Sequence, residues 1–162
     1  MSLNVNFLSP LEFQITIDRL PHVQFFTQQT AIPGISSSPV AVPTRLNTTY
    51  QPGDEVDFSN LDLTFIVDEA MGNYQEIFNW IVRANFPDNH EQYQAIEGNL
   101  FSDISIIILN SKKNPNIKFT YKNCFPISLS DVSLDTTNSD VVYPQVTATF
   151  QYDTFSIDML TN

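Results

Sequence analysis

Apolar and polar residues alternate along several short stretches of this chain, which is the pattern of a β-strand with one buried face. Residues 11–18, 61–67 and 144–152 show it most clearly, and residues 155–159 resume it after a change of phase at Asp153. Residues 104–109 are apolar on both sides, as in a central strand. We also predict a strand at residues 22–30 that forms an N-terminal hairpin with residues 11–18.

A polar hairpin is predicted at residues 44–58. Strand-forming residues at 44–50 and 55–58 flank a turn with Pro52, Gly53 and Asp54 at its tip. Residues 36–43 are extended and interrupted by prolines, which predicts an edge strand or a connecting arm. A two-stranded hairpin is marginal in water by itself, so we expect this one to protrude and dock on another chain.

A helix is predicted at residues 73–86, where Asn73 is a good N-cap and Glu76 follows three residues later, as in a capping box. Trp80 lies off its apolar stripe, and either flanks the core or contacts another subunit. The residues expected to pack this helix on the sheet are Tyr74, Ile77, Phe78 and Ile81.

The elements add up to a mainly β protein, with about eight strands and one helix. We predict a single domain over residues 1–162: an antiparallel β-sandwich or barrel with one flanking α-helix and a long protruding β-hairpin.

The net charge of −11 argues against binding nucleic acid through its phosphates, which requires a basic surface. Four lysines lie within residues 112–122, and they form either a solvated face or a contact with an acidic neighbour. No apolar run reaches the length of a membrane span, so we expect no membrane insertion by the chain itself. The first residues lack a signal peptide, which predicts synthesis in the cytoplasm.

The sequence offers no catalytic constellation. His22 and His90 are far apart, and Cys124 has the surroundings of a buried, inert thiol. Asp68 and Glu69 are neighbours that point to opposite sides of a strand, so they do not form an acid/base pair. We therefore expect no enzyme activity, no metal site and no cofactor.

The order of these segments resembles a known family. An early Phe-Gln-Ile-Thr-Ile strand leads to Thr-Ala-Ile-Pro-Gly at residues 30–34, and a polar arm reaches Gly53 and Asp54 with Phe58 behind it. Leu-Thr-Phe-Ile-Val-Asp-Glu then ends at Glu69, and a helix with Trp80 follows. This pattern resembles the tail tube protein of contractile-tailed bacteriophages. Residues 123–130 also look like the tube-like domain of baseplate tube-initiator proteins, so a baseplate-proximal ring, or a type VI secretion-like tube protein, is the alternative.

The resemblance implies homohexameric rings whose sheets join into a 24-stranded barrel and stack into a hollow tube. It implies a place in the virion and several partners: the sheath protein, the baseplate tube-initiator proteins, and the tape measure protein and phage DNA in the lumen, without specific binding. The inter-subunit and inter-ring hairpin would consist of Thr44, Arg45, Asn47, Thr49, Tyr50, Pro52, Gly53, Asp54, Glu55 and Phe58. The candidate lumen-facing residues, which could equally form a solvated sheet face, are Asp62, Thr64, Thr147, Thr149 and Gln151.

Overall fold

A computed structural model describes residues 8, 11–85, 100–137, 140 and 142–160. Its elements in chain order are β1 (Phe13–Ile17), α1 (Pro21–Phe26), β2 (Thr27–Thr30), β3 (Ile35–Ser37), β4 (Val40–Pro43), β5 (Thr48–Gln51), β6 (Val56–Phe58), β7 (Leu61–Ile66), α2 (Gly72–Asn85), β8 (Ser102–Leu109), β9 (Pro115–Leu129), β10 (Gln145–Gln151) and β11 (Thr154–Met159). The predicted fold class, mainly antiparallel β with one main helix, is confirmed.

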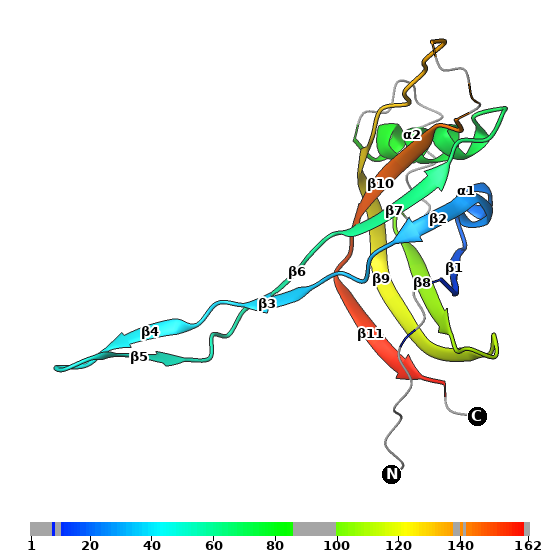
Figure 1. The fold of residues 1–162 in the computed structure, drawn as a ribbon. Helices are drawn as coiled ribbons and strands as arrows, with labels where there is room; N and C mark the ends of the chain where they lie inside the picture. The colour runs from blue at the N-terminus through cyan, green and yellow to red at the C-terminus, as the bar shows by residue number, and fades with distance from the viewer. Residues whose placement is uncertain (1–7, 9–10, 86–99, 138–139, 141, 161–162) are drawn as a thin grey trace.

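Strand β9 is shared by two sheets (Figure 1). Its first part pairs with β8 on one edge and β11 on the other, and β8 pairs with β1; we call these four strands sheet A. Its last part pairs with β10, β10 pairs with β7, and β7 pairs with β2; we call these four strand segments sheet B. Every pairing is antiparallel, and the two sheets do not close into a barrel within one chain.

The core lies where the alternating strands of both sheets turn their apolar faces inward. On β7, Leu61, Leu63 and Phe65 are fully buried, as their two-residue period predicts. Helix α2 adds Ile77 and Trp80, whose ring lies 6.1 Å from that of Phe150 on β10. The Trp80 indole N–H donates to the carbonyl oxygen of Leu100 at 2.9 Å, so this residue belongs to the core.

The predicted N-terminal hairpin is wrong. Residues 21–26 form helix α1, and only Thr27–Thr30 are a strand. Pro21 at the start of α1 has the φ angle that a first helical turn requires, and Leu20 and Val23 become buried three positions apart. Strand β1 pairs with β8, while β2 pairs with β7.

A long two-stranded arm leaves the body between β2 and β7 (Figure 1). Strands β3 and β6 pair near the body, and β4 and β5 pair farther out. We call residues 35–58 the arm and residues 39–52 the distal arm.

Candidate assembly surfaces

The hairpin predicted at residues 44–58 is only half of the arm, and its tip was misplaced. The turn lies at residues 44–47, where the backbone N–H of Thr44 donates to the carbonyl oxygen of Asn47 at 2.7 Å. The strand before this turn, β4, was predicted only as an edge or connecting segment; it is the direct partner of β5. The turn carries Thr44, Arg45 and Asn47, and Thr49 and Tyr50 lie on β5.

Pro52, Gly53, Asp54 and Glu55 form a break between the two ladders of the arm instead of its tip. A Cβ atom on Gly53 would lie 2.0 Å from the carbonyl oxygen of Ser38. No side chain fits at that distance, so glycine is required by the close approach of the two backbones. This break separates the distal arm from the part next to the body.

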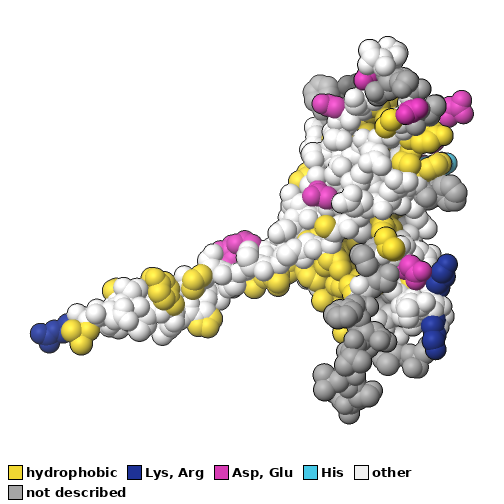
Figure 2. Space-filling view, in the orientation of Figure 1, with side chains coloured by type: hydrophobic (Ala, Val, Ile, Leu, Met, Phe, Trp, Pro, Cys, Tyr) yellow, Lys and Arg dark blue, Asp and Glu magenta, His cyan; other side chains and the backbone are white. Residues whose placement is uncertain are grey.

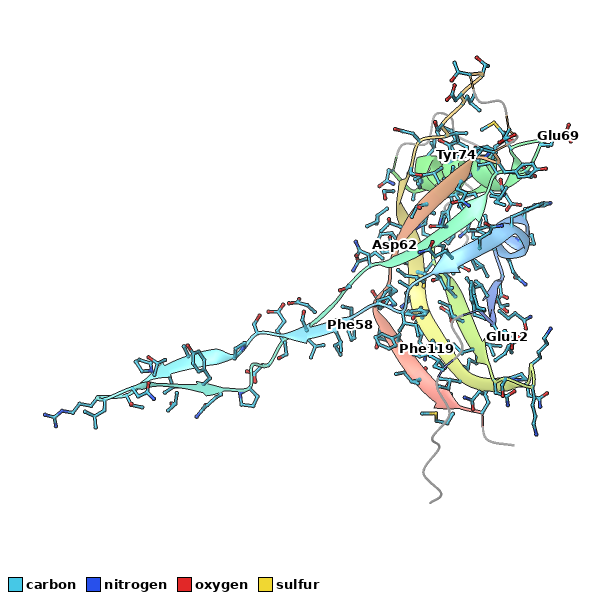
Figure 3. All side chains as sticks on the ribbon, viewed as in Figure 1. Glu12, Phe58, Asp62, Glu69, Tyr74 and Phe119 are labelled. Carbon is cyan, nitrogen blue, oxygen red and sulfur yellow. The ribbon has the colours of Figure 1, made fainter. Side chains whose placement is uncertain are left out.

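Phe58 lies where the arm joins the body (Figure 3). Its ring centroid is 6.0 Å from that of Tyr152 and 5.6 Å from that of Phe155. The base of the arm is therefore held by an aromatic cluster that is continuous with the core.

The predicted lumen residues come together on one face of sheet B. The Thr64 and Thr147 hydroxyls are hydrogen bonded at 2.9 Å, and the Thr149 hydroxyl donates to an Asp62 carboxylate oxygen at 2.7 Å. These are directly opposed pairs in the β7–β10 register. Gln151 follows Thr149 by two residues on β10, so the alternation places it on the same face.

The described strands that form this polar face carry no cationic side chain. The four strand segments of sheet B, Thr27–Thr30, Leu61–Ile66, Gln145–Gln151 and residues 125–129, include no Lys or Arg, and their acidic residue is Asp62. Hydroxyl and amide groups dominate it. Such a surface offers no charged partner to a phosphate.

Both edges of sheet B are open in the part of the chain that the structure describes. Strand β2 pairs with β7 on one side, and residues 125–129 pair with β10 on one side. Beside that second edge lies a hollow of about 310 Å³, lined mainly by apolar groups that include Phe101, Phe125 and Ile127. Open strand edges and adjacent apolar hollows are sites where another chain can pair.

Helix α2 lies where it was predicted, but its buried side differs. It begins at Gly72, one residue before the predicted start, and its described part ends at Asn85. Phe78, which was expected to pack on the sheet, is 50% exposed, while Tyr74 and Ile81 are partly buried against the core. The buried stripe comprises Asn73, Ile77 and Trp80.

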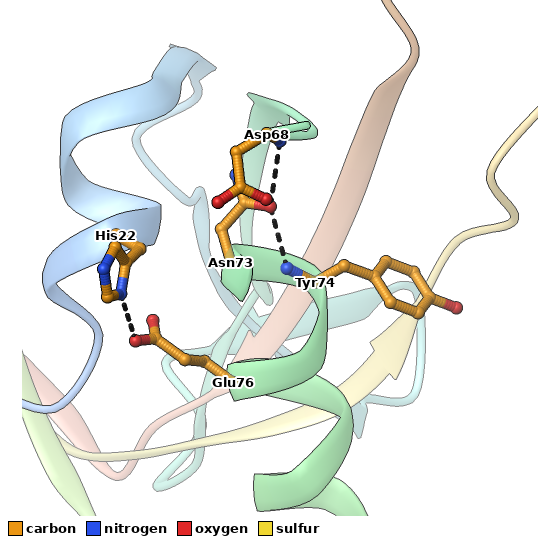
Figure 4. A network of polar contacts seen from close by, with 5 residues as sticks. All are labelled: His22, Asp68, Asn73, Tyr74 and Glu76. Atoms are coloured by element: carbon orange, nitrogen blue, oxygen red, sulfur yellow. Dashed lines mark hydrogen bonds and ion pairs between the residues drawn. The ribbon is translucent and has the colours of Figure 1, made fainter. Parts of the chain in front are cut away.

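Asn73 ties the start of α2 to the end of β7 (Figure 4). Its amide Nδ2 donates to the Ile66 carbonyl oxygen at 2.7 Å, and its Oδ1 accepts from the backbone N–H groups of Tyr74 at 2.8 Å and Asp68 at 3.3 Å. Glu76 does not complete a capping box with it. Its carboxylate instead contacts His22 Nδ1 at 2.5 Å, which raises the pKa of that imidazole.

The described residues include no group of three or more His, Cys, Asp or Glu placed to hold a metal ion. Burial raises the pKa of the Cys124 thiol to about 12, so it is not an activated nucleophile. Among the described helices, none is long and apolar enough to cross a membrane. The surfaces that stand out are the arm and sheet B.

Three comparisons with known proteins are informative in different ways: a family model and solved structures match the chain and agree with each other, and no curated protein matches it. The family model, described as phage tail tube protein, matches residues 4–158.

Solved structures share the fold along nearly the whole chain. One is the sheath/tube terminator of an extracellular contractile injection system, PVC, with 19% identity, 96% of this chain and 99% of that chain covered, and a TM-score of 0.69. Another is the tube-terminating cap of the anti-feeding prophage, with 18% identity, 98% of this chain and 96% of that chain covered, and a TM-score of 0.68. A type VI secretion system effector from Yersinia pestis is more distant, with 7% identity, 93% of this chain and 92% of that chain covered, and a TM-score of 0.52.

Proposed function

Because this chain belongs to the phage tail tube protein family, we propose that six copies join through sheet B into a ring, and that rings stack into a hollow tube. The chain is a structural tube protein. The proposal concerns how it assembles, and one observation carries it: sheet B is polar on one face and open at both edges.

The topology of sheet B suits closure between copies. Its four strands alternate in direction, so the edge strand β2 of one copy would meet residues 125–129 of the next copy in antiparallel orientation. Six such sheets make a barrel of 24 strands, the number that the family resemblance implies. Closure would remove the open edges, which are an aggregation hazard in a free subunit.

The polar face of sheet B would then line the lumen. Its hydroxyl and amide groups and the carboxylate of Asp62 give phosphates no cation to bind, so DNA would slide past without sticking. The partners that we propose for the assembled tube are a contractile sheath around it, tube-initiator proteins at a baseplate, and a tape measure protein and phage DNA within it. In this proposal the subunit is a component of the virion.

Negative-stain microscopy of the purified chain, together with a mass measurement, tests the ring. We expect hollow sixfold rings or tubes; a ring that never extends, even when baseplates are added, would favour the baseplate-proximal alternative. A chain that remains an 18.4 kDa monomer with baseplates present would contradict the proposal.

A seam variant makes this test specific. Ile127→Asp places a charge beside the open edge of sheet B, at a side chain that is already partly exposed, and we expect it to prevent ring closure. Leu134→Asp is the matched control, because it adds the same charge at an exposed position in the loop after β9, outside the strands of the sheet. Equal ring formation by both variants, each with unchanged thermal stability, would rule out this seam.

A further inference from the structure

An apolar surface at the angle between the arm and β11 is left uncovered by the described residues. Figure 2 shows hydrophobic side chains gathered along the lower side of the arm base and onto the body beneath it. We call this surface the apolar corner. It comprises Ile35, Val56, Phe58, Phe155, Ile157 and Met159.

The β11 part of the corner is a continuation of the core. Phe155, Ile157 and Met159 lie opposite Tyr121, Phe119 and Ile117 in the β9–β11 register, so they share the face that is buried on β9. Yet Ile157 is 53% exposed and Met159 is 71% exposed, while Tyr121 and Phe119 are buried. A core face that emerges into solvent at an edge strand is typical of an interaction site.

The apolar surface extends from β11 onto one side of the β3–β6 ladder at the base of the arm. Ile35 pairs with Phe58, and Val56 lies two residues from Phe58 on β6, so the three share one side of the ladder. Asp57 pairs with Ser36 on the opposite side. Phe58 contacts the rings of Tyr152 and Phe155, which makes the apolar surface continuous from arm to body.

The distal arm has the chemistry that fits such a surface. Residues 39–52 contain a single charged residue, Arg45, in a chain with 18 acidic residues. Their exposed apolar side chains include Val40, Leu46 and Tyr50, and a two-stranded ladder this exposed is marginal by itself. In Figure 1 the distal arm extends away from its own body, so its packing surface must come from another molecule.

We propose that the apolar corner of one copy receives the distal arm of a second copy. Each copy then has one projecting element and one receiving surface at different places, which is a heterologous contact that repeats from copy to copy. The inference rests on the proposed tube assembly, and it names the acceptor surface for the arm. It predicts that β11, and not only the arm, governs assembly.

Site-specific photo-crosslinking tests the contact directly. The photoreactive amino acid p-benzoylphenylalanine replaces Ile157 in one preparation and Ser156, on the opposite face of β11, in a control. Each is co-assembled with isotopically heavy chain, irradiated, and analysed by mass spectrometry. We expect position 157 to crosslink to heavy peptides from residues 39–52 and position 156 not to do so. Crosslinks from position 157 to any other segment or protein, or none in assembled material, would overturn the inference.

A pair of charge variants supplies an independent readout. Ile157→Asp with Met159→Asp puts two charges in the corner, and Thr154→Asp with Ser156→Asp puts two on the other face of the same strand. The four positions differ only in the face of the strand they occupy, because all of them are exposed and lie on β11. We expect the first variant to lose sedimenting tubes at unchanged melting temperature and the control to retain them. Equal assembly by both variants would contradict the corner while leaving the tube proposal intact, because failure of the proposed function would instead appear as absence of rings from the unsubstituted chain.

Discussion

Replacing Asn73 with alanine should weaken the docking of α2 on the sheets. This side chain is fully buried and joins three backbone groups: the Ile66 carbonyl and the N–H groups of Tyr74 and Asp68. Alanine would leave all three without this partner. Because the Ile66 bond at 2.7 Å is short and lies within the fold, water cannot replace it without a local opening.

The size of the loss follows from these groups. A buried polar group that loses its partner costs about 1–3 kcal/mol. Asn73 lies within α2 and serves three such groups that are close together, so their costs overlap and we expect a total of about 2–4 kcal/mol. For a chain of this size each kcal/mol lowers Tm by about 2–4 °C.

Urea unfolding followed by tryptophan fluorescence measures this loss. The chain has one tryptophan, Trp80, which is buried on α2 against Phe150, so its emission reports on the same helix. Asn73→Asp keeps the acceptor but turns a carboxylate oxygen toward the Ile66 carbonyl oxygen in a buried site, so it should lose at least as much stability as the alanine variant. Gln75→Ala, at an exposed position of α2, is the control and should change the free energy of unfolding little. A loss from Asn73→Ala below about 0.5 kcal/mol would refute the reasoning, because it is smaller than one hydrogen bond.

Three further changes test other parts of the molecule. Gly53→Ala forces a methyl group to 2.0 Å from the Ser38 carbonyl oxygen, so tube formation seen by microscopy should fail while Tm is retained. Tyr121→Phe removes a buried hydroxyl that has no hydrogen-bond partner among the described residues, and should raise the free energy of unfolding by roughly 1 kcal/mol in urea titrations, whereas a destabilised variant would reveal a partner. His22 Nδ1 donates a hydrogen bond to the Glu76 carboxylate, which raises the pKa of His22 above 6.5, so the stabilising effect of the pair is complete below pH 6.5 and is lost as pH rises through the folded pKa. His22→Gln should remove that pH dependence from thermal melts, and an unchanged profile would show that the pair contributes nothing.

Periodicity in the sequence was enough to identify most strands and their buried faces. On β7 and β10 the apolar set lies inward and the polar set outward, as alternation requires. The candidate polar face could be named for the same reason. Even spacing places Asp62 with Thr64 on one strand, and Thr147 with Thr149 on another. The structure adds the register that brings the two pairs onto one face, where they are hydrogen bonded.

The buried side of α2 could not be read from hydrophobicity. The predicted stripe contained Phe78 in place of Trp80 and did not include Asn73. Asn73 is buried because backbone groups of β7 and the following turn satisfy its amide, and Trp80 because the Leu100 carbonyl accepts its N–H. Both partners lie outside the helix, so no pattern within the helix contains them.

The arm shows the same limit for strands. Pro52, Gly53 and Asp54 have the composition of a hairpin tip, but the turn lies at residues 44–47, because β4 pairs with β5 and β3 with β6. Only the backbone contact between Gly53 and Ser38 reveals why the glycine is there.

By itself the sequence determined which side chains of the alternating strands can be buried, and the approximate position of those strands and of the main helix. These are local properties, set by side-chain polarity and by periods of two and 3.6 residues. The tertiary structure decided which strands pair, where the arm turns, and which apolar and polar surfaces stay open at β2, β9 and β11. Those features depend on contacts between segments far apart in the chain, and their energies come from packing and register that no local pattern records.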